Sequence, residues 1–280
     1  MKYKCFEVSF SNNIAHVVMN RPEKRNAMVK DFWTELPAII RDIDDNSKAR
    51  VIVISSTGPV FSAGIDIGMF ASDIGGSSDK NSPQYGLEFY NNNVLPLQNS
   101  FTAIEQCRIP VIAAIQGGCY GGGVDLITAC DMRFGTNDSF ITIFEINVGM
   151  TADVGTFPRI LNHMPEGVVR ELAYTGRKMS AVECKERGLF NNVYENKEKM
   201  ISSVMAIAKE IATKPPLAVY GCKRIITYSR DHTTMDTLDN IAVWNMSMLS
   251  PSEMTEAMVS TKQKRQGQFT ELPKKKNLGI

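Results

Sequence analysis

Two hydrophobic periodicities alternate along the first sixty residues. Apolar side chains occupy every second position in residues 4–10 and 14–19, and SNN at 11–13 between them predicts a β-hairpin. Residues 27–45 instead carry their apolar side chains at the spacing of a helix, and VIVISS at 51–56 is a short β-rich run. A hairpin followed by a helix and a strand predicts a mixed α/β domain.

The same mixture of strand and helix patterns continues along most of the chain. PVIAAI at 110–115 is a short apolar strand, and GGCYGGGVDLITAC after it predicts a tight turn into a helix. FGTNDSFITIF at 134–144 has the pattern of a further strand, and the Gly- and Ser-rich residues 71–84 predict a surface loop. Helices are expected at 85–106 and at about 155–162, 165–175 and 180–187.

Only helical periodicity follows residue 196. Four helices are expected, at roughly 197–212, 216–228, 233–247 and 251–265. Methionines on the last two helices provide an adaptable apolar surface that suits packing on the core or on another subunit. We therefore predict a catalytic core over residues 1–196 and a helical region over residues 197–280.

The composition changes this picture mainly by exclusion. The chain has 280 residues, of which 43% are apolar and 22% charged, and 31 basic against 30 acidic residues give a net charge of +1. These values exclude a disordered chain and a global field that attracts nucleic acid, and the sequence contains no basic patch interleaved with aromatic residues. The longest apolar runs are far shorter than the roughly 18 residues of a membrane-spanning helix. We expect no nucleic-acid partner and no membrane span.

Signature motifs of common cofactor sites are missing from the sequence. Neither a Walker loop nor GxGxxG occurs, the three histidines lack metal-ligand spacing, and no GxSxG motif of a serine hydrolase is present. The six cysteines form no CxxC pair, so we expect them to be reduced packing residues. We expect neither a metal ion nor another cofactor.

Two glycine-bearing turns are the first candidate for chemistry, FSAGIDI at 61–67 and GGCYGGGVDL at 117–126. Glycines between a strand and a helix leave backbone N–H groups uncovered, and the first N–H groups of a helix have no intrahelical acceptor. Two such turns that converge would form an oxyanion hole with two donors. The alternative is that the glycines only permit close packing of a helix.

Three carboxylates lie beside these turns in the sequence. Asp125 falls in the first turn of the helix that begins near Gly121, where the helix dipole by itself favours an acid. Asp153 precedes the helix start VGTFPRI and could be only an N-cap. Glu145 closes the apolar strand ITIF, where desolvation would raise its pKa and suit it to proton transfer.

The two glycine turns, together with FEINVGMTADVG and TGRKMSAVECKERGLFNNVY, resemble the crotonase, or enoyl-CoA hydratase/isomerase, superfamily. The resemblance covers roughly residues 5–260. The combination of GGGVD and ADVG, with an acid at each place, is similar to the branch that isomerises 3,5-dienoyl-CoA to 2,4-dienoyl-CoA in fatty-acid β-oxidation. It implies a crotonase-like spiral of ββα units with a C-terminal helical trimerisation region, and homotrimers or homohexamers. It also implies that the helical region forms part of the coenzyme A site, and that the acyl-CoA thioester is the substrate.

The resemblance assigns roles to individual residues. The oxyanion donors fall on the N–H groups of Ile65 and Gly122, and the three acids fall on Glu145, Asp153 and Asp125. We assign Glu145 as the base at carbon 2, Asp153 as the acid at carbon 6, and Asp125 as a supporting acid. The thioester-binding segment is Ala63, Gly64, Ile65, Asp66 and Ile67, and candidate contacts for coenzyme A phosphates are Lys24 and Arg25, with Lys262, Lys264 and Arg265 near the C-terminus.

Two alternatives remain open from the sequence. One is another activity of the superfamily, enoyl-CoA hydration or delta(3)-delta(2)-enoyl-CoA isomerisation, and the other is a catalytically idle homologue that acts as a scaffold or binds RNA. Hydratases of the superfamily carry glutamates at the first two acid positions and usually glycine at the third, so Asp153 disfavours hydration. The start MKYKCFEVSF and the end Leu278-Gly279-Ile280 show no recognisable targeting signal, although the resemblance points to the mitochondrial or peroxisomal matrix.

Overall fold

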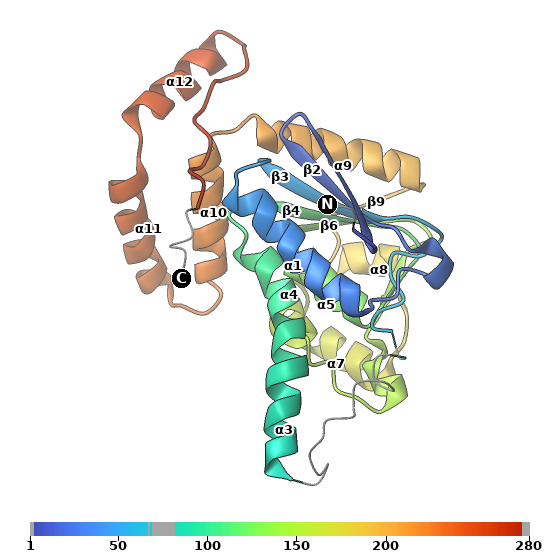
Figure 1. The fold of residues 1–280 in the computed structure, drawn as a ribbon. Coiled ribbons are helices and arrows are strands. Elements are labelled where there is room, and N and C mark those ends of the chain that lie inside the picture. The colour runs from blue at the N-terminus through green and yellow to red at the C-terminus, as the bar shows by residue number, and fades with distance from the viewer. Residues whose placement is uncertain (1–2, 67, 69–81, 276–280) are drawn as a thin grey trace.

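Two β-sheets form the centre of the computed structural model, which describes residues 3–66, 68 and 82–275 (Figure 1). The larger sheet has the strand order β1-β2-β3-β4-β6-β9, and the smaller one has the order β5-β7-β8. Within the larger sheet only β1 and β2 are antiparallel. The larger sheet is built from β1 (Phe6–Ser11), β2 (Ile14–Met19), β3 (Val51–Ser56), β4 (Val111–Ile115), β6 (Met132–Thr136) and β9 (Asn192–Tyr194). The predicted α/β class is confirmed.

The N-terminal hairpin closes through two asparagines. Asn12 and Asn13 have positive φ angles of 52° and 61°, a conformation that asparagine tolerates better than most residues. They join Ser11 directly to Ile14, which are paired across the hairpin. The turn predicted at residues 11–13 is therefore confirmed.

Strand β3 is buried on both faces, and its side chains alternate between two hydrophobic clusters. Val51 and Val53 pack in the cluster that includes residues of α9 (Lys197–Ala212), whereas Ile52 and Ile54 pack in the cluster that includes α1 (Lys30–Asp45). The two helices cover opposite faces of the larger sheet (Figure 1). Helix α9, although it begins the helical third of the chain, thus belongs to the packing of the sheet.

The single strand predicted over residues 134–144 is wrong in one respect. The segment contains the end of β6 and all of β7 (Phe140–Thr142), which belong to different sheets. Asn137 and Asp138 form a turn between them, closed by a hydrogen bond of 2.9 Å from the Ser139 N–H to the Thr136 carbonyl. Asn, Asp and Ser favour turns because their side chains compete for backbone groups. The smaller sheet is completed by β5 (Gly118–Tyr120) and β8 (Met179–Ser180).

The remaining α-helices agree with the predicted ranges. Residues 85–106 lie in α3 (Pro83–Phe89), η2 (Tyr90–Val94) and α4 (Leu95–Gln106), while residues 71–81 of the predicted loop lie outside the described residues. The others are α5 (Gly122–Ala129), α6 (Thr156–Ile160), α7 (Glu166–Thr175), α8 (Ala181–Glu186), α10 (Pro216–Tyr228), α11 (Thr234–Met248) and α12 (Pro251–Lys262). Two short 3₁₀ helices, η1 (Pro22–Lys24) and η3 (Phe144–Val148), lie outside the predicted helices.

Helices α11 and α12 extend away from the two sheets (Figure 1). In this single chain α11 has no buried side chain, although it carries exposed apolar residues such as Met235, Leu238 and Met246.

No helix in the described part of the chain combines the length and apolar character needed to cross a membrane. All six cysteines are unpaired, and five of them are buried.

Candidate functional site

The two glycine turns predicted from the sequence meet in the structure. Residues 61–66 run beside β5, and the Tyr120 N–H donates a hydrogen bond of 3.0 Å to the Ser62 carbonyl. A Cβ atom added to Gly64 would lie only 2.7 Å from the Tyr120 carbonyl oxygen, and Gly64 has a φ of +80°. Glycine is required at this position because any side chain would separate the two turns.

Two backbone donors converge where the turns meet. Gly122 is the first residue of α5, and a Cβ atom added to it would lie 3.5 Å from the Ile65 nitrogen. The neighbouring Gly121 N–H donates to the Thr142 carbonyl at 3.0 Å. Neither the Ile65 N–H nor the Gly122 N–H has an acceptor among the described residues. The pair can therefore bind one oxyanion, with the N-terminus of α5 adding its positive dipole end.

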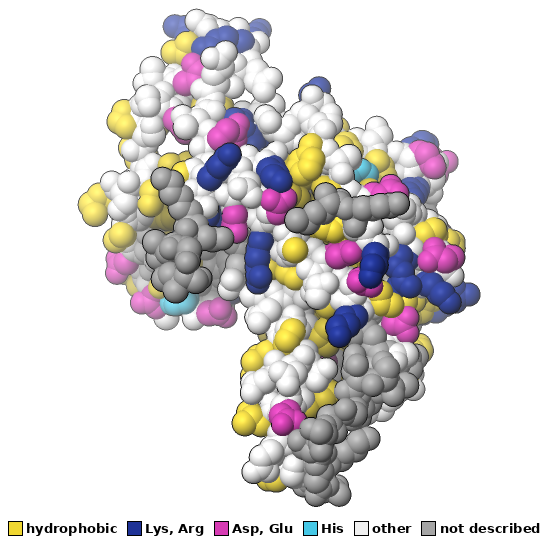
Figure 2. Space-filling model, viewed as in Figure 1, with side chains coloured by type: hydrophobic (Ala, Val, Ile, Leu, Met, Phe, Trp, Pro, Cys, Tyr) yellow, Lys and Arg dark blue, Asp and Glu magenta, His cyan; other side chains and the backbone are white. Residues whose placement is uncertain are grey.

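The loop after the first hairpin holds residues 61–66, which we call the oxyanion segment, in place. The Ala63 N–H donates to the Arg25 carbonyl at 2.9 Å, and the Met28 N–H donates to the Gly64 carbonyl at 2.8 Å. The side chains of Lys24 and Arg25 are exposed beside this contact. Figure 2 shows Lys and Arg side chains gathered on this part of the surface. The arrangement brings two candidate phosphate contacts next to the oxyanion segment.

The other predicted binding residues have separate positions. The Asp66 N–H donates to the Met28 carbonyl at 3.1 Å, which extends the same contact, and Ile67 lies outside the described residues. Lys262 ends α12, and Lys264 and Arg265 follow it. In the single chain these three cations lie at the end of α12, away from the two turns (Figure 1). Arg265 is paired with Glu256 at 2.6 Å.

Glu145 lies in η3 and not at the end of a strand, so its predicted secondary structure is wrong. Strand β7 ends at Thr142 and the chain then turns into the short 3₁₀ helix. This turn places the carboxylate against Gly121, where an added Cβ atom would lie 3.1 Å from Oε1. Its Oε2 atom is buried without a hydrogen-bond partner among the described residues. A carboxylate with a free, buried oxygen beside the oxyanion donors is placed to take a proton.

Asp125 caps a helix that begins thirty-one residues later. Its Oδ1 atom accepts a hydrogen bond of 2.6 Å from the Thr156 N–H, the first donor of α6. The residue that precedes α6 is Gly155, which has no side chain to serve as a cap. The suggestion that Asp153 is only an N-cap is therefore wrong, because Asp125 performs that role from the neighbouring helix α5.

Desolvation raises the pKa of all three acids, and neighbouring carboxylates add to this for Asp125 and Glu145. Burial raises the pKa of Asp125 to about 7, and the neighbouring Glu145 carboxylate and then Asp153 add to this. Burial also raises the pKa of Glu145, with a further contribution from Asp153, and burial raises the pKa of Asp153. Desolvation and like charge both disfavour the ionised form, so the group is suited to exchange protons near neutral pH.

The acids also differ in exposure, from the fully buried Asp125 to the exposed Asp153. This gradient places Asp125 behind the other two acids, away from solvent.

Across residues 3–66, 68 and 82–275, no group of three or more His, Cys, Asp and Glu side chains is arranged to hold a metal ion.

Helix α4 contributes side-chain contacts to this region that the sequence patterns did not predict. The Gln98 side chain donates a hydrogen bond of 2.7 Å to the Asp153 carbonyl oxygen, and Thr102 and Glu105 contact Arg159 of α6. These three positions of α4 are spaced i, i+4 and i+7, which is one face of a helix. A polar stripe on a helix that is otherwise packed in the core was the available signal.

The chain is similar to known proteins in sequence and in fold. The family model described as Enoyl-CoA hydratase/isomerase matches residues 9–272. A mouse (Mus musculus) protein named mitochondrial Delta(3,5)-Delta(2,4)-dienoyl-CoA isomerase is 40% identical over 267 residues, which cover 94% of this chain and 81% of the relative. A peroxisomal protein of the same name from Arabidopsis thaliana is 38% identical over 273 residues, covering 96% and 98% of the two chains. The crystal structure of enoyl-CoA hydratase from Bacillus anthracis superimposes with a TM-score of 0.84 at 25% identity, covering 98% and 100%.

Proposed function

This chain is an enzyme that belongs to the enoyl-CoA hydratase/isomerase family, and on that premise we propose that it converts 3,5-dienoyl-CoA into 2,4-dienoyl-CoA in fatty-acid β-oxidation. The family expected from the sequence motifs is confirmed. The observation that carries the proposal is the group of three acids, Asp125, Glu145 and Asp153, beside two unpaired backbone donors. Relatives named for this reaction, at about 40% identity, support it.

The oxyanion donors make the first proton transfer possible. Removing a proton from carbon 2 of a 3,5-dienoyl thioester places negative charge on the thioester oxygen as an extended enolate. The N–H groups of Ile65 and Gly122 stabilise that charge where it develops, and one such donor is worth about 2.7–4 kcal/mol of transition-state stabilisation. Both donors are available in the folded chain because no described residue accepts from them.

Two of the three acids account for the movement of both double bonds. Glu145 takes the proton from carbon 2, and Asp153 delivers a proton to carbon 6, so that the double bonds shift to positions 2 and 4. Burial raises the pKa of both carboxyl groups, which makes Glu145 a stronger base and helps Asp153 to retain its proton. Each proton-transfer group contributes roughly 10²–10⁴-fold in rate.

Asp125 supports the other two acids and does not carry a proton to the substrate. Its Oδ1 atom is occupied by the Thr156 N–H, and its side chain is completely buried. It fixes the start of α6, directly after the segment that carries Asp153. The role assigned is therefore to hold the acid group together.

A substrate comparison tests this function. Purified protein is offered a 3,5-dienoyl-CoA and a 2-enoyl-CoA, and the formation of conjugated dienoyl product is compared with hydration. We expect turnover of the 3,5-dienoyl thioester to exceed hydration by at least about 10²-fold, because the position of Asp153 serves protonation at carbon 6. Preferential hydration of the 2-enoyl thioester would contradict the proposal.

The coenzyme A portion of the substrate needs cations for its phosphates. We assign Lys24 and Arg25 to this role, since they are exposed next to the oxyanion segment. The reaction as written needs no cofactor besides the acyl-CoA substrate, because both protons move between the substrate and carboxyl groups.

We also propose that the chain forms homotrimers or dimers of trimers. Residues 197–280 serve as the oligomerisation region and residues 1–196 as the catalytic core, with α9 anchoring the first to the second. The apolar residues of α11 and α12 support this, because Met246 and Met258 are 83% and 63% exposed in the single chain. Light scattering at micromolar concentration tests the assembly, and a monomer of 31.1 kDa would contradict it.

A further inference from the structure

The segment that carries Asp153 is held by side chains from other elements. Within the described part of the chain, residues 151–154 make no backbone-to-backbone hydrogen bond. Ala152 and Val154 on either side of Asp153 are buried, which anchors the segment on the core. The hydrogen bond from Gln98 to the Asp153 carbonyl reaches the residue from outside. The main chain at Asp153 is therefore held from α4.

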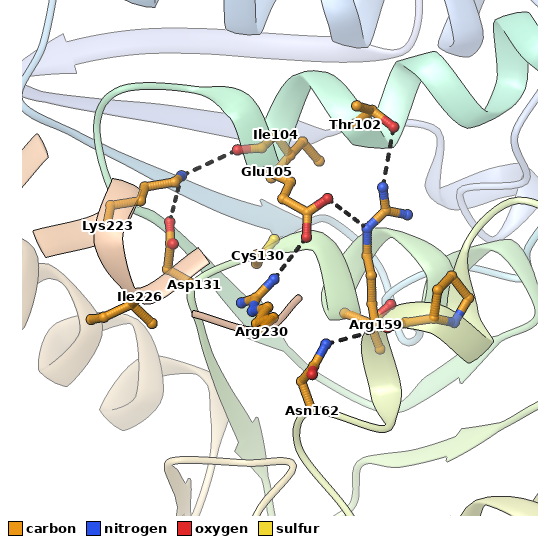
Figure 3. A network of polar contacts seen from close by, with 12 residues as sticks. Thr102, Ile104, Glu105, Cys130, Asp131, Arg159, Asn162, Lys223, Ile226 and Arg230 are labelled. Carbon is orange, nitrogen blue, oxygen red and sulfur yellow. Dashed lines mark hydrogen bonds and ion pairs between the residues drawn. The ribbon is translucent and has the colours of Figure 1, made fainter. Parts of the chain in front are cut away.

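Helix α4 contacts the segment and the helix that follows it along one polar stripe. Gln98 contacts Asp153, and the next residues on the same face, Thr102 and Glu105, contact Arg159. The Arg159 guanidinium donates from Nη2 to the Thr102 hydroxyl at 3.1 Å and from Nε to the Glu105 carboxylate at 3.2 Å (Figure 3). Other residues of α4 are buried in the hydrophobic core, so the stripe is held rigidly.

Arg159 also fixes the backbone next to Asp153. A Cβ atom added to Gly155 would lie 1.9 Å from Arg159 Nη1, so the guanidinium rests directly on that glycine. The other oxygen of Glu105 accepts a hydrogen bond of 2.7 Å from Arg230, which lies between α10 and α11 (Figure 3). Glu105 is thus held by two arginines. Its position fixes the Arg159 guanidinium, which in turn packs against Gly155.

We propose that Gln98, Thr102, Glu105 and Arg159 form a positioning clamp that directs the Asp153 carboxyl group toward carbon 6 of the substrate. None of the four acts on the substrate itself. The inference rests on the proposed function, in which Asp153 supplies the second proton and Glu145 removes the first. The clamp contacts the Asp153 segment and α6, whereas Glu145 is placed by η3 and Gly121. Its loss therefore affects the second proton transfer selectively.

Two matched pairs of substitutions separate positioning from stability. Gln98→Leu removes the hydrogen bond to Asp153, and Asn99→Leu makes the same change at the next, exposed position of α4. Arg159→Met removes a buried cation of the clamp. Lys223→Met removes another buried cation, which contacts Asp131 at 2.8 Å in the neighbouring part of the network (Figure 3). The other hydrogen bonds of Lys223 go to the carbonyls of Ile104 and Ile109, so none of them reaches residues 151–159.

The experiment uses the full-length chain and two readouts. The first is amide hydrogen exchange of peptides that cover residues 149–158, which requires no substrate. The second compares the rate of 2,4-dienoyl product formation with the rate at which solvent deuterium enters carbon 2 of the thioester. We expect Gln98→Leu and Arg159→Met to accelerate amide exchange and to lower product formation by roughly 10–10²-fold while carbon-2 exchange changes less than about 2-fold. Arg159→Lys, which keeps the charge, should recover part of the loss.

Several results would overturn the clamp. One is that each clamp variant behaves like its control in both readouts, Gln98→Leu like Asn99→Leu and Arg159→Met like Lys223→Met. Another is that product formation and carbon-2 exchange fall together in the clamp variants. If Arg159→Met fails to fold, Gln98→Leu decides alone, because Gln98 is only partly buried. If the unaltered protein does not isomerise a 3,5-dienoyl-CoA, the proposed function fails, and amide exchange by itself then supports or overturns the clamp.

Discussion

Residues 61–66 and 118–122 meet through backbone hydrogen bonds and positive-φ glycines, whereas residues 151–154, which carry Asp153, make no backbone-to-backbone hydrogen bond in the described part of the chain. The oxyanion side of the site is therefore built from main-chain atoms, and Asp153 on the acid side is placed by side chains. The two turns of the oxyanion side can approach each other because glycines occupy the positions where they meet. The acid side needs partners on α4 and α5, which come from distant parts of the sequence.

This difference teaches how one scaffold can serve related reactions. An oxyanion hole made of main-chain N–H groups supports any reaction that places charge on a thioester oxygen. The carboxyl groups decide which carbon receives a proton, because their positions depend on replaceable side-chain contacts. We therefore expect substitutions on the two sides to differ in which chemical step they impair.

The largest effect is expected from Gly122→Pro on the oxyanion side. Proline has no N–H, so the variant loses one oxyanion donor, and turnover should fall by at least about 10²–10³-fold. Gly122→Ala is the matched control, because its Cβ meets the same neighbours, Ile65 and Met28, while the N–H remains. Steady-state rates of both variants, with circular dichroism to verify folding, make the comparison. Equal activity in the two variants would remove the Gly122 N–H from the mechanism.

Asp153→Asn is expected to have the next largest effect, and on the second step alone. Asparagine keeps the size of the side chain but has no proton to transfer, so formation of the 2,4-dienoyl product should fall by at least about 10²-fold. Incorporation of solvent deuterium at carbon 2 should continue, because Glu145 and the oxyanion donors are unchanged. Loss of both processes together would reverse the roles assigned to Glu145 and Asp153.

A smaller effect is expected from Gly155→Ala. The new Cβ would lie 1.9 Å from Arg159 Nη1, and the φ of +126° adds strain, so the segment next to Asp153 must shift. We expect product formation to fall by about 10-fold, as for a modest misplacement of a catalytic group. Gly149→Ala, at a φ of +74° with open space around it, is the control. Similar rates in the two variants would show that the contact with Arg159 does not matter.

The smallest effect is expected from Asp125→Asn, and it concerns stability as a function of pH. Burial raises the pKa of Asp125 to about 7 in the folded chain, against about 4 when unfolded, so the folded state binds the extra proton between these values. The stability that this proton provides is present below about pH 4 and is lost as the pH rises toward 7, by on the order of 1 kcal/mol per pH unit.

Asparagine keeps the acceptor for the Thr156 N–H and does not ionise. The free energy of unfolding of Asp125→Asn should therefore exceed that of the unaltered protein by a margin that grows between pH 4 and 7. Urea titrations at a series of pH values measure the difference. Parallel pH curves for the two proteins would show that Asp125 ionises as readily in the folded chain as in the unfolded one.

The sequence by itself determined the mixed α/β class, the helical C-terminal third and the two glycine turns. Each depends on residues within a few positions of one another, as in the alternation of residues 14–19 or the glycines of 121–123. The acids Asp125, Glu145 and Asp153 were candidates from their positions beside the turns, and the family resemblance then assigned their roles. Their residue types stand out beside the turns, although the periodicity alone assigns them no partner.

Only the tertiary structure decided what holds those acids. The turn at Asn137 and Asp138 sends β6 and β7 into different sheets, and η3 then places Glu145 against Gly121. Asp125 caps a helix 31 residues away, and Gln98 reaches Asp153 across 55 residues. Local periodicity determines which face of a helix is polar, but the element that this face meets depends on how all the elements pack around the shared core.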